Sequence, residues 1–273
     1  MSGFFDALLH HSFLQNALLA GILASIVCGV MGTFVVIKRI TFISGGIAHA
    51  VLGGVGIAYF LNIEPLIGAF AFAILAAIII GLVKLKAGQQ EDTVISALWA
   101  IGMALGVIFM YLTPGYSVDL LTYLFGNILM VTKSDLLILV ILNVTILSVV
   151  FVLYRQFISI SFDEEYSRLR GLNVNVLYIF LLILIALTIV VLIQIVGLIL
   201  VIALLTLPAA IAGLFTRTPA SMMVLAVILG MLFTGGGMIL SYEPNLPVGA
   251  SIIILSGVVY LVALNLKKMI SKK

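Results

Sequence analysis

The chain has 273 residues, of which 64% are hydrophobic and 8% are charged, and its formal net charge is +3. A soluble domain carries about 25% charged residues, so this composition excludes an ordinary water-soluble protein. The basic residues are spread along the chain and form no single patch, which argues against nucleic acid as a partner. Cys28 is the one cysteine and lies in an apolar run, so we expect it to pack inside the protein.

Nine stretches without Asp, Glu, Lys or Arg are long enough to cross a hydrocarbon core roughly 30 Å thick. Because the backbone in lipid must bond to itself, and the short alternating segments of a barrel are absent, the sequence predicts an all-α, polytopic integral membrane helix bundle. We expect residues 1–273 to form a single transmembrane domain without a removable signal peptide. The predicted spans are 13–37, 42–61, 66–83, 93–112, 136–154, 176–193, 196–215, 220–240 and 248–266.

The distribution of lysine and arginine favours nine spans, because these residues are concentrated in short cytoplasmic loops. With the N-terminus outside, every basic residue except Lys133 falls on the cytoplasmic side. The uncharged stretch 174–216 leaves the count open between eight and nine. Its interruptions at Gly197 and Pro208 fit either two spans joined by a tight turn or one span followed by a broken helix.

The cytoplasmic loop at about 156–173 contains the signals of a short helix. Acidic residues begin the helical pattern, a basic residue lies near its end, and a glycine provides a C-terminal stop. The loop is either a docking surface for a partner or a solvated connector. The residues concerned are Asp163, Glu164, Glu165, Tyr166, Arg168 and Gly171.

His49 is the one strongly polar titratable side chain within the predicted spans. A neutral imidazole can bind a metal, carry a proton or pack with a hydrogen bond, and position alone leaves these roles open. The small residues between Ser44 and Gly56 favour close helix contact. We expect His10 and His11 to lie at the membrane interface, and the methionines of the spans to fill gaps in the packing.

The predicted outer side carries more acidic than basic residues. Asp119, Glu64 and Glu243 are candidates for a vestibule that attracts cations, although the same asymmetry results from positive-inside sorting alone. The outer loop also contains a semi-apolar piece at 120–130, which fits a short interfacial helix.

No catalytic residues are predicted, because the spans contain neither a Ser-His-Asp set nor a carboxylate pair. No lysine follows a glycine, so the chain lacks the phosphate-binding loop GxxxxGK[ST]. Active transport would therefore draw its energy from a partner. A secondary carrier stays an alternative, disfavoured by the absence of charged residues within the spans.

Several segments together resemble the zinc, manganese and iron permeases of bacterial and archaeal ABC transporters, the ABC-3 family. The resemblance covers nearly the whole chain, and the order and spacing of the segments make it specific. The segments are GTFVVIKR (32–39), IAHAVLGG (47–54), DLLTYLFGNIL (119–129), SFDEEYSRLRGLNV (161–174), VGLILVIALLTLPAAIA (196–212) and SYEPNLPVGA (241–250).

The resemblance implies a permease in the plasma membrane of a bacterium or archaeon that imports a divalent metal ion by alternating access. It implies an extracytoplasmic metal-binding protein, a cytoplasmic ABC ATPase that binds ATP, and a second permease copy as partners. No stably bound cofactor is expected. It also places His49 in the metal pathway and makes the segment from Asp163 to Leu172 the coupling helix that contacts the ATPase.

The chain departs from the family at Gly45, where members commonly carry Asp, and at Gly53, where Pro is common. The usual pair of carboxylate and imidazole is therefore incomplete. A lone imidazole favours zinc, with manganese next, because manganese prefers oxygen ligands. A permease for an iron chelate or cobalamin is the alternative within the same transport class.

Overall fold

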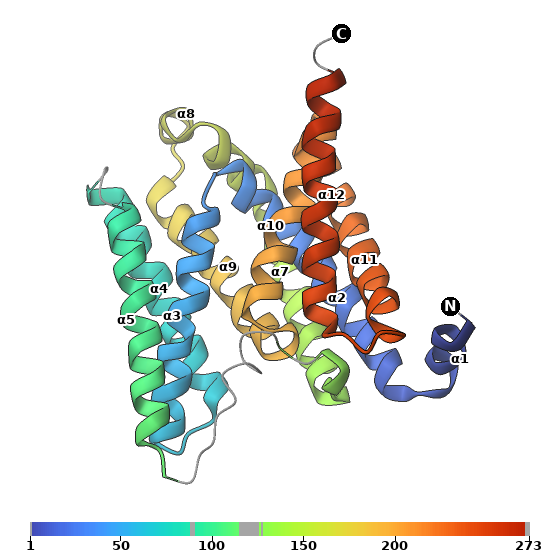
Figure 1. Cartoon of the computed structure of the whole chain (residues 1–273). Coiled ribbons are helices and arrows are strands. Elements are labelled where there is room, and N and C mark those ends of the chain that lie inside the picture. The colour runs from blue at the N-terminus through green and yellow to red at the C-terminus, as the bar shows by residue number, and fades with distance from the viewer. Residues whose placement is uncertain (1, 88–90, 115–125, 127, 271–273) are drawn as a thin grey trace. The chain divides into compact units, whose positions relative to one another are not determined.

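The computed structural model describes every residue except 1, 88–90, 115–125, 127 and 271–273. The regular structure of the described residues is helical (Figure 1). The elements are α1 (Ser2–His10), α2 (Ser12–Ile37), α3 (Thr41–Phe60), α4 (Pro65–Ala87), α5 (Glu91–Leu112), the 3-10 turn η1 (Ile128–Met130), α7 (Lys133–Phe162), α8 (Glu164–Leu169), α9 (Val174–Val196), α10 (Leu198–Phe215), α11 (Pro219–Tyr242) and α12 (Val248–Ile270).

Among the described residues, nine helices are long and apolar enough to cross a membrane, namely α2, α3, α4, α5, α7, α9, α10, α11 and α12. This confirms the predicted all-α, polytopic bundle and its nine spans. Helix α7 has 30 residues and continues beyond the predicted end of its span as far as Phe162. The hydropathy pattern did not predict α1. The interfacial helix expected at 120–130 falls largely outside the described residues, and η1 occupies its end.

The uncharged stretch 174–216 forms two helices that are separated by one residue. Helix α9 ends at Val196 and α10 begins at Leu198, with Gly197 between them at φ +82°. Only glycine adopts this left-handed backbone without a steric cost, so the chain can break there within a single residue. Of the two alternatives, the structure shows two spans joined by a tight turn. Pro208 is buried inside α10.

Close contacts divide the chain into two compact units. The first comprises residues 1–36, 121–149 and 191–273, in which α10, α11 and α12 pack against one another. The second comprises residues 37–120 and 150–190 and contains α3, α4, α5 and α8. The assignment of residues 1–273 to one permease domain stays a prediction.

In the second unit, α3 packs against both α4 and α5 (Figure 1). A Cβ atom on Gly54 of α3 would clash with the carbonyl oxygen of Gly68 in α4. A Cβ atom on Gly53 would lie 2.9 Å from the carbonyl oxygen of Gly102 in α5. These approaches confirm the predicted close contact. Gly45 of the same helix has no such neighbour. A Cβ atom added there would have no atom of another helix within 4 Å.

We therefore expect Gly54→Ala to lower the thermal stability of the purified chain, because backbone atoms of α4 cannot move aside for the added methyl group. Overpacking of this kind costs about 1–3 kcal/mol. Gly45→Ala is the matched control on the same helix, and its melting temperature should be unchanged or slightly higher. The measurement is circular dichroism at rising temperature in detergent. Equal melting temperatures for the two variants would contradict the packing described here.

Candidate functional site

His49 lies on α3 and stacks against Trp99 of α5. The two ring centroids are 4.1 Å apart and the ring planes differ by 8°. The imidazole is half-buried, and its buried Nδ1 atom has no hydrogen-bond partner in the described structure. Metal-binding histidines usually fix the second ring nitrogen with a hydrogen bond. In this chain, the aromatic face of Trp99 is what orients the ring.

Trp99 is itself held by a neighbour on its own helix. Its indole Nε1–H donates to the sulfur of Met103 at 3.0 Å, one turn further along α5. The ring centroid of Phe42 on α3 lies 6.3 Å from that of Trp99. The hydrogen bond to Met103 and the contact with Phe42 hold the indole in place. Its ring face is therefore a stable surface for His49.

The helix turn before His49 offers few further metal ligands. Gly45, one turn before His49 on the same helix, has open space around its equivalent Cβ position. The Ser44 hydroxyl donates to the backbone oxygen of Thr41 at 2.8 Å and so has a local partner. Within the described residues, no group of three or more His, Cys, Asp or Glu side chains is arranged to hold a metal ion. The described geometry offers one imidazole beside an open space and no closed metal cage.

Two of the three acidic residues of the predicted vestibule are described, and they belong to different compact units. Glu64 is exposed, and its backbone oxygen accepts from the amide of Ile67 at the start of α4. Glu243 is exposed at the end of α11, in the other compact unit. Asp119 lies outside the described residues. The outer vestibule stays a prediction.

Helix α8 forms where its capping signals predicted a helix. Asp163 is the N-cap, and its Oδ1 accepts from the backbone N–H of Tyr166 at 2.9 Å. At the other end Gly171 has φ +81°, its N–H donates to the Arg168 oxygen at 2.9 Å, and the Leu172 N–H donates to the Ser167 oxygen at 3.1 Å. This pair of bonds is a Schellman motif, which ends the helix.

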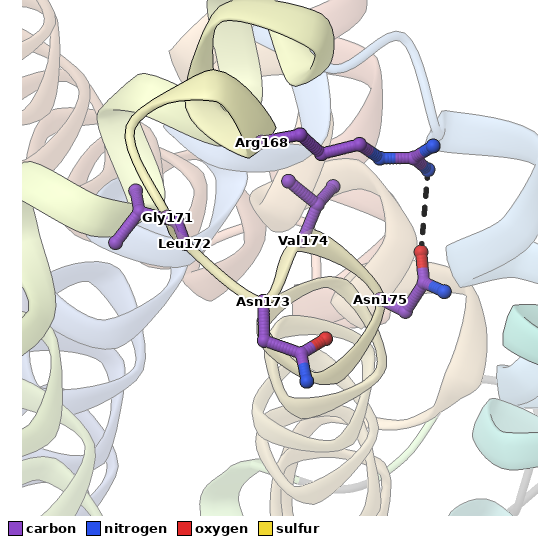
Figure 2. A pocket seen from close by; sticks show the side chains of 6 residues that line it. All are labelled: Arg168, Gly171, Leu172, Asn173, Val174 and Asn175. Atoms are coloured by element: carbon purple, nitrogen blue, oxygen red, sulfur yellow. Dashed lines mark hydrogen bonds between the residues drawn. The ribbon is translucent and has the colours of Figure 1, made fainter.

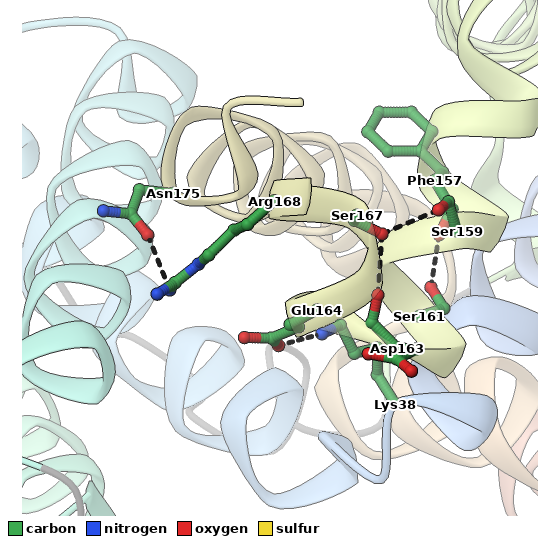
Figure 3. Close-up of polar contacts among 9 residues, drawn as sticks. All are labelled: Lys38, Phe157, Ser159, Ser161, Asp163, Glu164, Ser167, Arg168 and Asn175. Carbon is green, nitrogen blue, oxygen red and sulfur yellow. Dashed lines mark hydrogen bonds and ion pairs between the residues drawn. The ribbon is translucent and has the colours of Figure 1, made fainter. Parts of the chain in front are cut away.

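The inner face of α8 is fixed by polar contacts (Figure 3). Ser167 is fully buried, its hydroxyl lies 2.6 Å from that of Ser159 on α7, and it donates to the Asp163 backbone oxygen at 2.7 Å. Glu164 forms an ion pair with Lys38, which lies between α2 and α3. The helix is thus tied both to the end of α7 and to the start of α3.

Lys38 is almost completely buried, with 6% of its side chain exposed. Its ammonium group also lies 5.1 Å from the ring centroid of Tyr178 on α9, and Lys84 of α4 lies 5.3 Å from the same ring. Burial lowers the pKa of Lys38, and Lys84 lowers it further, whereas the Glu164 carboxylate raises it. The carboxylate and the aromatic face together stabilise a cation that water does not solvate.

The outer face of α8 is exposed and mixes charged with apolar side chains. The apolar side chain of Leu169 is 84% exposed even though it lies outside the spans, where lipid would not cover it. Tyr166 is also exposed, and the guanidinium of Arg170 lies over its ring. Arg168 donates to the side-chain oxygen of Asn175 at 3.3 Å. This contact lies beside an open groove of about 450 Å³ lined by Arg168, Gly171, Leu172, Asn173, Val174 and Asn175 (Figure 2).

Comparison with known proteins assigns the family. Residues 10–267 match the family described as the ABC 3 transport family. The chain belongs to this family. The assignment confirms the resemblance seen in the sequence and, with the nine apolar helices, makes the chain a multi-pass membrane transport protein.

Relatives of this ABC 3 family chain match over nearly its full length. "Probable metal transport system membrane protein" of Chlamydia muridarum is 44% identical, over 92% of the chain and 88% of the relative. Manganese transport system membrane protein MntC of Listeria monocytogenes is 37% identical, over 95% and 92%. A chain of PsaBC from Streptococcus pneumoniae in complex with Fab has a similar structure, with a TM-score of 0.86, 34% identity and coverage of 96% and 94%.

Sequence reasoning missed several residues that the structure places around His49 and α8 in this ABC 3 family chain. They share a feature, which is that each belongs to a different element or turn from the residue it contacts. Hydropathy predicts the spans but not which faces of two spans meet. The residues are Lys38, Lys84, Trp99, Ser159, Asn175 and Tyr178.

We expect Asp163→Ala to loosen α8, because the amide of Tyr166 loses its acceptor. Removing an N-cap costs about 1 kcal/mol of helix stability. Amide hydrogen exchange followed by mass spectrometry should become faster across residues 164–169 and stay unchanged elsewhere. Thr218→Ala, which removes the N-cap of α11, is the control and should affect only the start of that helix. Unchanged exchange at 164–169 in Asp163→Ala would show that the cap does not hold α8.

Proposed function

We propose that the chain is the membrane-spanning permease of an ATP-driven importer for a divalent metal ion. The observation that carries the proposal is the family match over residues 10–267, read together with a relative named as a manganese transport system membrane protein. The nine apolar helices and the helix α8 outside the spans fit a permease of this kind. The ion is the substrate of the chain and is released after transport.

The permease works with partners that supply binding and energy. The sequence has no phosphate-binding loop, so a cytoplasmic ABC ATPase hydrolyses ATP and contacts the exposed face of α8. That face offers apolar contacts through Leu169 and Tyr166 and a basic contact through Arg168. An extracytoplasmic protein delivers the metal, and a second copy of the permease completes the transport path in the plasma membrane.

His49 is the residue that we assign to the metal path. Its half-buried imidazole borders the open space at Gly45, so an ion and its water can approach it. A nitrogen ligand favours zinc, whereas the name of the Listeria relative favours manganese, which prefers oxygen ligands. Backbone oxygens and water would complete the coordination of either ion. Both ions therefore belong in the uptake experiment.

His49→Ala should reduce metal uptake by the reconstituted transporter by at least about tenfold, because the path loses its nitrogen ligand. The assay combines the permease with its ATPase and binding protein in liposomes and follows ATP-dependent entry of zinc or manganese. His10→Ala is the matched control, since His10 is exposed and its Nδ1 lies 2.9 Å from the Asp6 backbone oxygen in α1. Uptake that survives His49→Ala would remove His49 from the path, and failure of both ions with the unmodified chain would refute metal import.

Metal binding at His49 should change the fluorescence of Trp99, which is the chain's single tryptophan and stacks on the imidazole. An ion on the ring withdraws electron density from the stacked pair and alters the emission. The measurement is a zinc titration of the purified permease, with zinc chosen because it does not quench by itself. The change should vanish in His49→Ala and persist in His10→Ala. Identical titrations of the unmodified chain and His49→Ala would place the zinc elsewhere.

A further inference from the structure

The ion pair between Lys38 and Glu164 joins segments that are 126 residues apart in the sequence. Lys38 lies at the turn where α2 ends and α3 begins, and the next residue, Arg39, has φ +57°. Lys38 lies three residues before Thr41, the first residue of the helix that carries His49. Glu164 is the first residue of α8 (Figure 3).

The two partners of this ion pair differ in burial. Lys38 has 6% of its side chain exposed, whereas Glu164 has 39% exposed. A buried charge without a partner is strongly destabilising, but a half-exposed carboxylate can be solvated by water. Lys38 therefore depends on Glu164 more than Glu164 depends on Lys38. Loss of the carboxylate leaves a buried ammonium group, whereas loss of the ammonium leaves a carboxylate that water can reach.

The surroundings of Lys38 come from several helices of the same compact unit. The ring of Tyr178 on α9 is almost completely buried, and the ammonium groups of Lys38 and Lys84 both lie over it. The cluster thus connects α8, α9, α4 and the start of α3. The contact between Ser159 and Ser167 joins residues only eight positions apart and fixes α8 to the end of α7. The ion pair instead reaches the helix that carries His49.

We propose that Lys38 is a positioning residue that couples α8 to α3. Its ion pair with Glu164 holds the cytoplasmic helix against the segment that leads into α3, so that a displacement of α8 by the ATPase also displaces the helix that presents His49. This inference rests on the proposed function as a permease driven by an ATPase. It adds a residue and a mechanical route between ATP hydrolysis and the metal path.

The test is the ratio of metal uptake to ATP hydrolysis, measured with the complete transporter in liposomes. Lys38→Met should keep ATP hydrolysis near the value of the unmodified transporter and lower uptake per ATP by at least about fivefold, a typical size for coupling between sites. Lys38→Arg preserves the charge and should restore the ratio. Lys267→Met, which removes an exposed lysine at the end of α12, is the matched control and should leave the ratio unchanged.

A double substitution separates coupling from folding. Glu164→Gln should reduce the yield of folded permease more than Lys38→Met, because it leaves the buried ammonium group without its carboxylate. Adding Lys38→Met to Glu164→Gln should restore the yield but not the uptake per ATP. Non-additive effects of this kind are expected for two residues that act through one contact.

Two results would overturn the inference. An unchanged ratio in Lys38→Met would show that the ion pair does not couple the helices, and an equal fall of uptake and hydrolysis would show that Lys38 serves assembly alone. In either case, uptake by the unmodified transporter would leave the proposed function standing. Absence of uptake with the unmodified chain would instead refute the proposed function itself.

Discussion

The hydrocarbon core of a membrane offers no hydrogen-bond partners to the backbone, and the rest of the structure follows from this constraint. Each span must be a helix, because a helix satisfies its N–H and C=O groups internally. Lipid chains are as apolar as the side chains, so helices are held together mainly by close packing. The glycines of α3 meet this need, since Gly54 and Gly53 bring α4 and α5 into backbone contact.

The same constraint governs polar side chains within the spans. The hydroxyl groups of Thr33, Thr188 and Thr206 each donate at 2.8 Å to the backbone oxygen one turn earlier in their own helix. The hydroxyl of a short side chain lies close enough to its own helix backbone to be satisfied in this way. The rigid imidazole of His49 has no such bond at Nδ1 and stacks on Trp99 instead. This arrangement is consistent with the role in the metal path that we propose for His49.

Most of the fold and part of the site were predictable from the sequence, and the reason is that these features are local. Runs without charged residues determine the spans. Asp163 and Gly171 lie close together in the sequence and determine where α8 begins and ends. The contact between His49 and Trp99 and the ion pair of Lys38 with Glu164 were not predictable. Both depend on how segments far apart in the sequence meet. For His49 and Trp99, the approach of α3 to α5 is set by small residues such as Gly53 and Gly102.

Under the proposed function, the open space at Gly45 bears on how tightly the metal path would hold its ion. A full set of protein ligands would bind a metal strongly and release it slowly, whereas transport requires binding that is favourable at entry and weak at exit. One imidazole, assisted by water and backbone oxygens, meets that requirement better than a closed cage. The selection of the ion then need not reside in His49 alone, because the protein that delivers the metal can discriminate before the ion reaches the membrane. On this view, the glycine at position 45 lowers the affinity of the proposed path without removing its function.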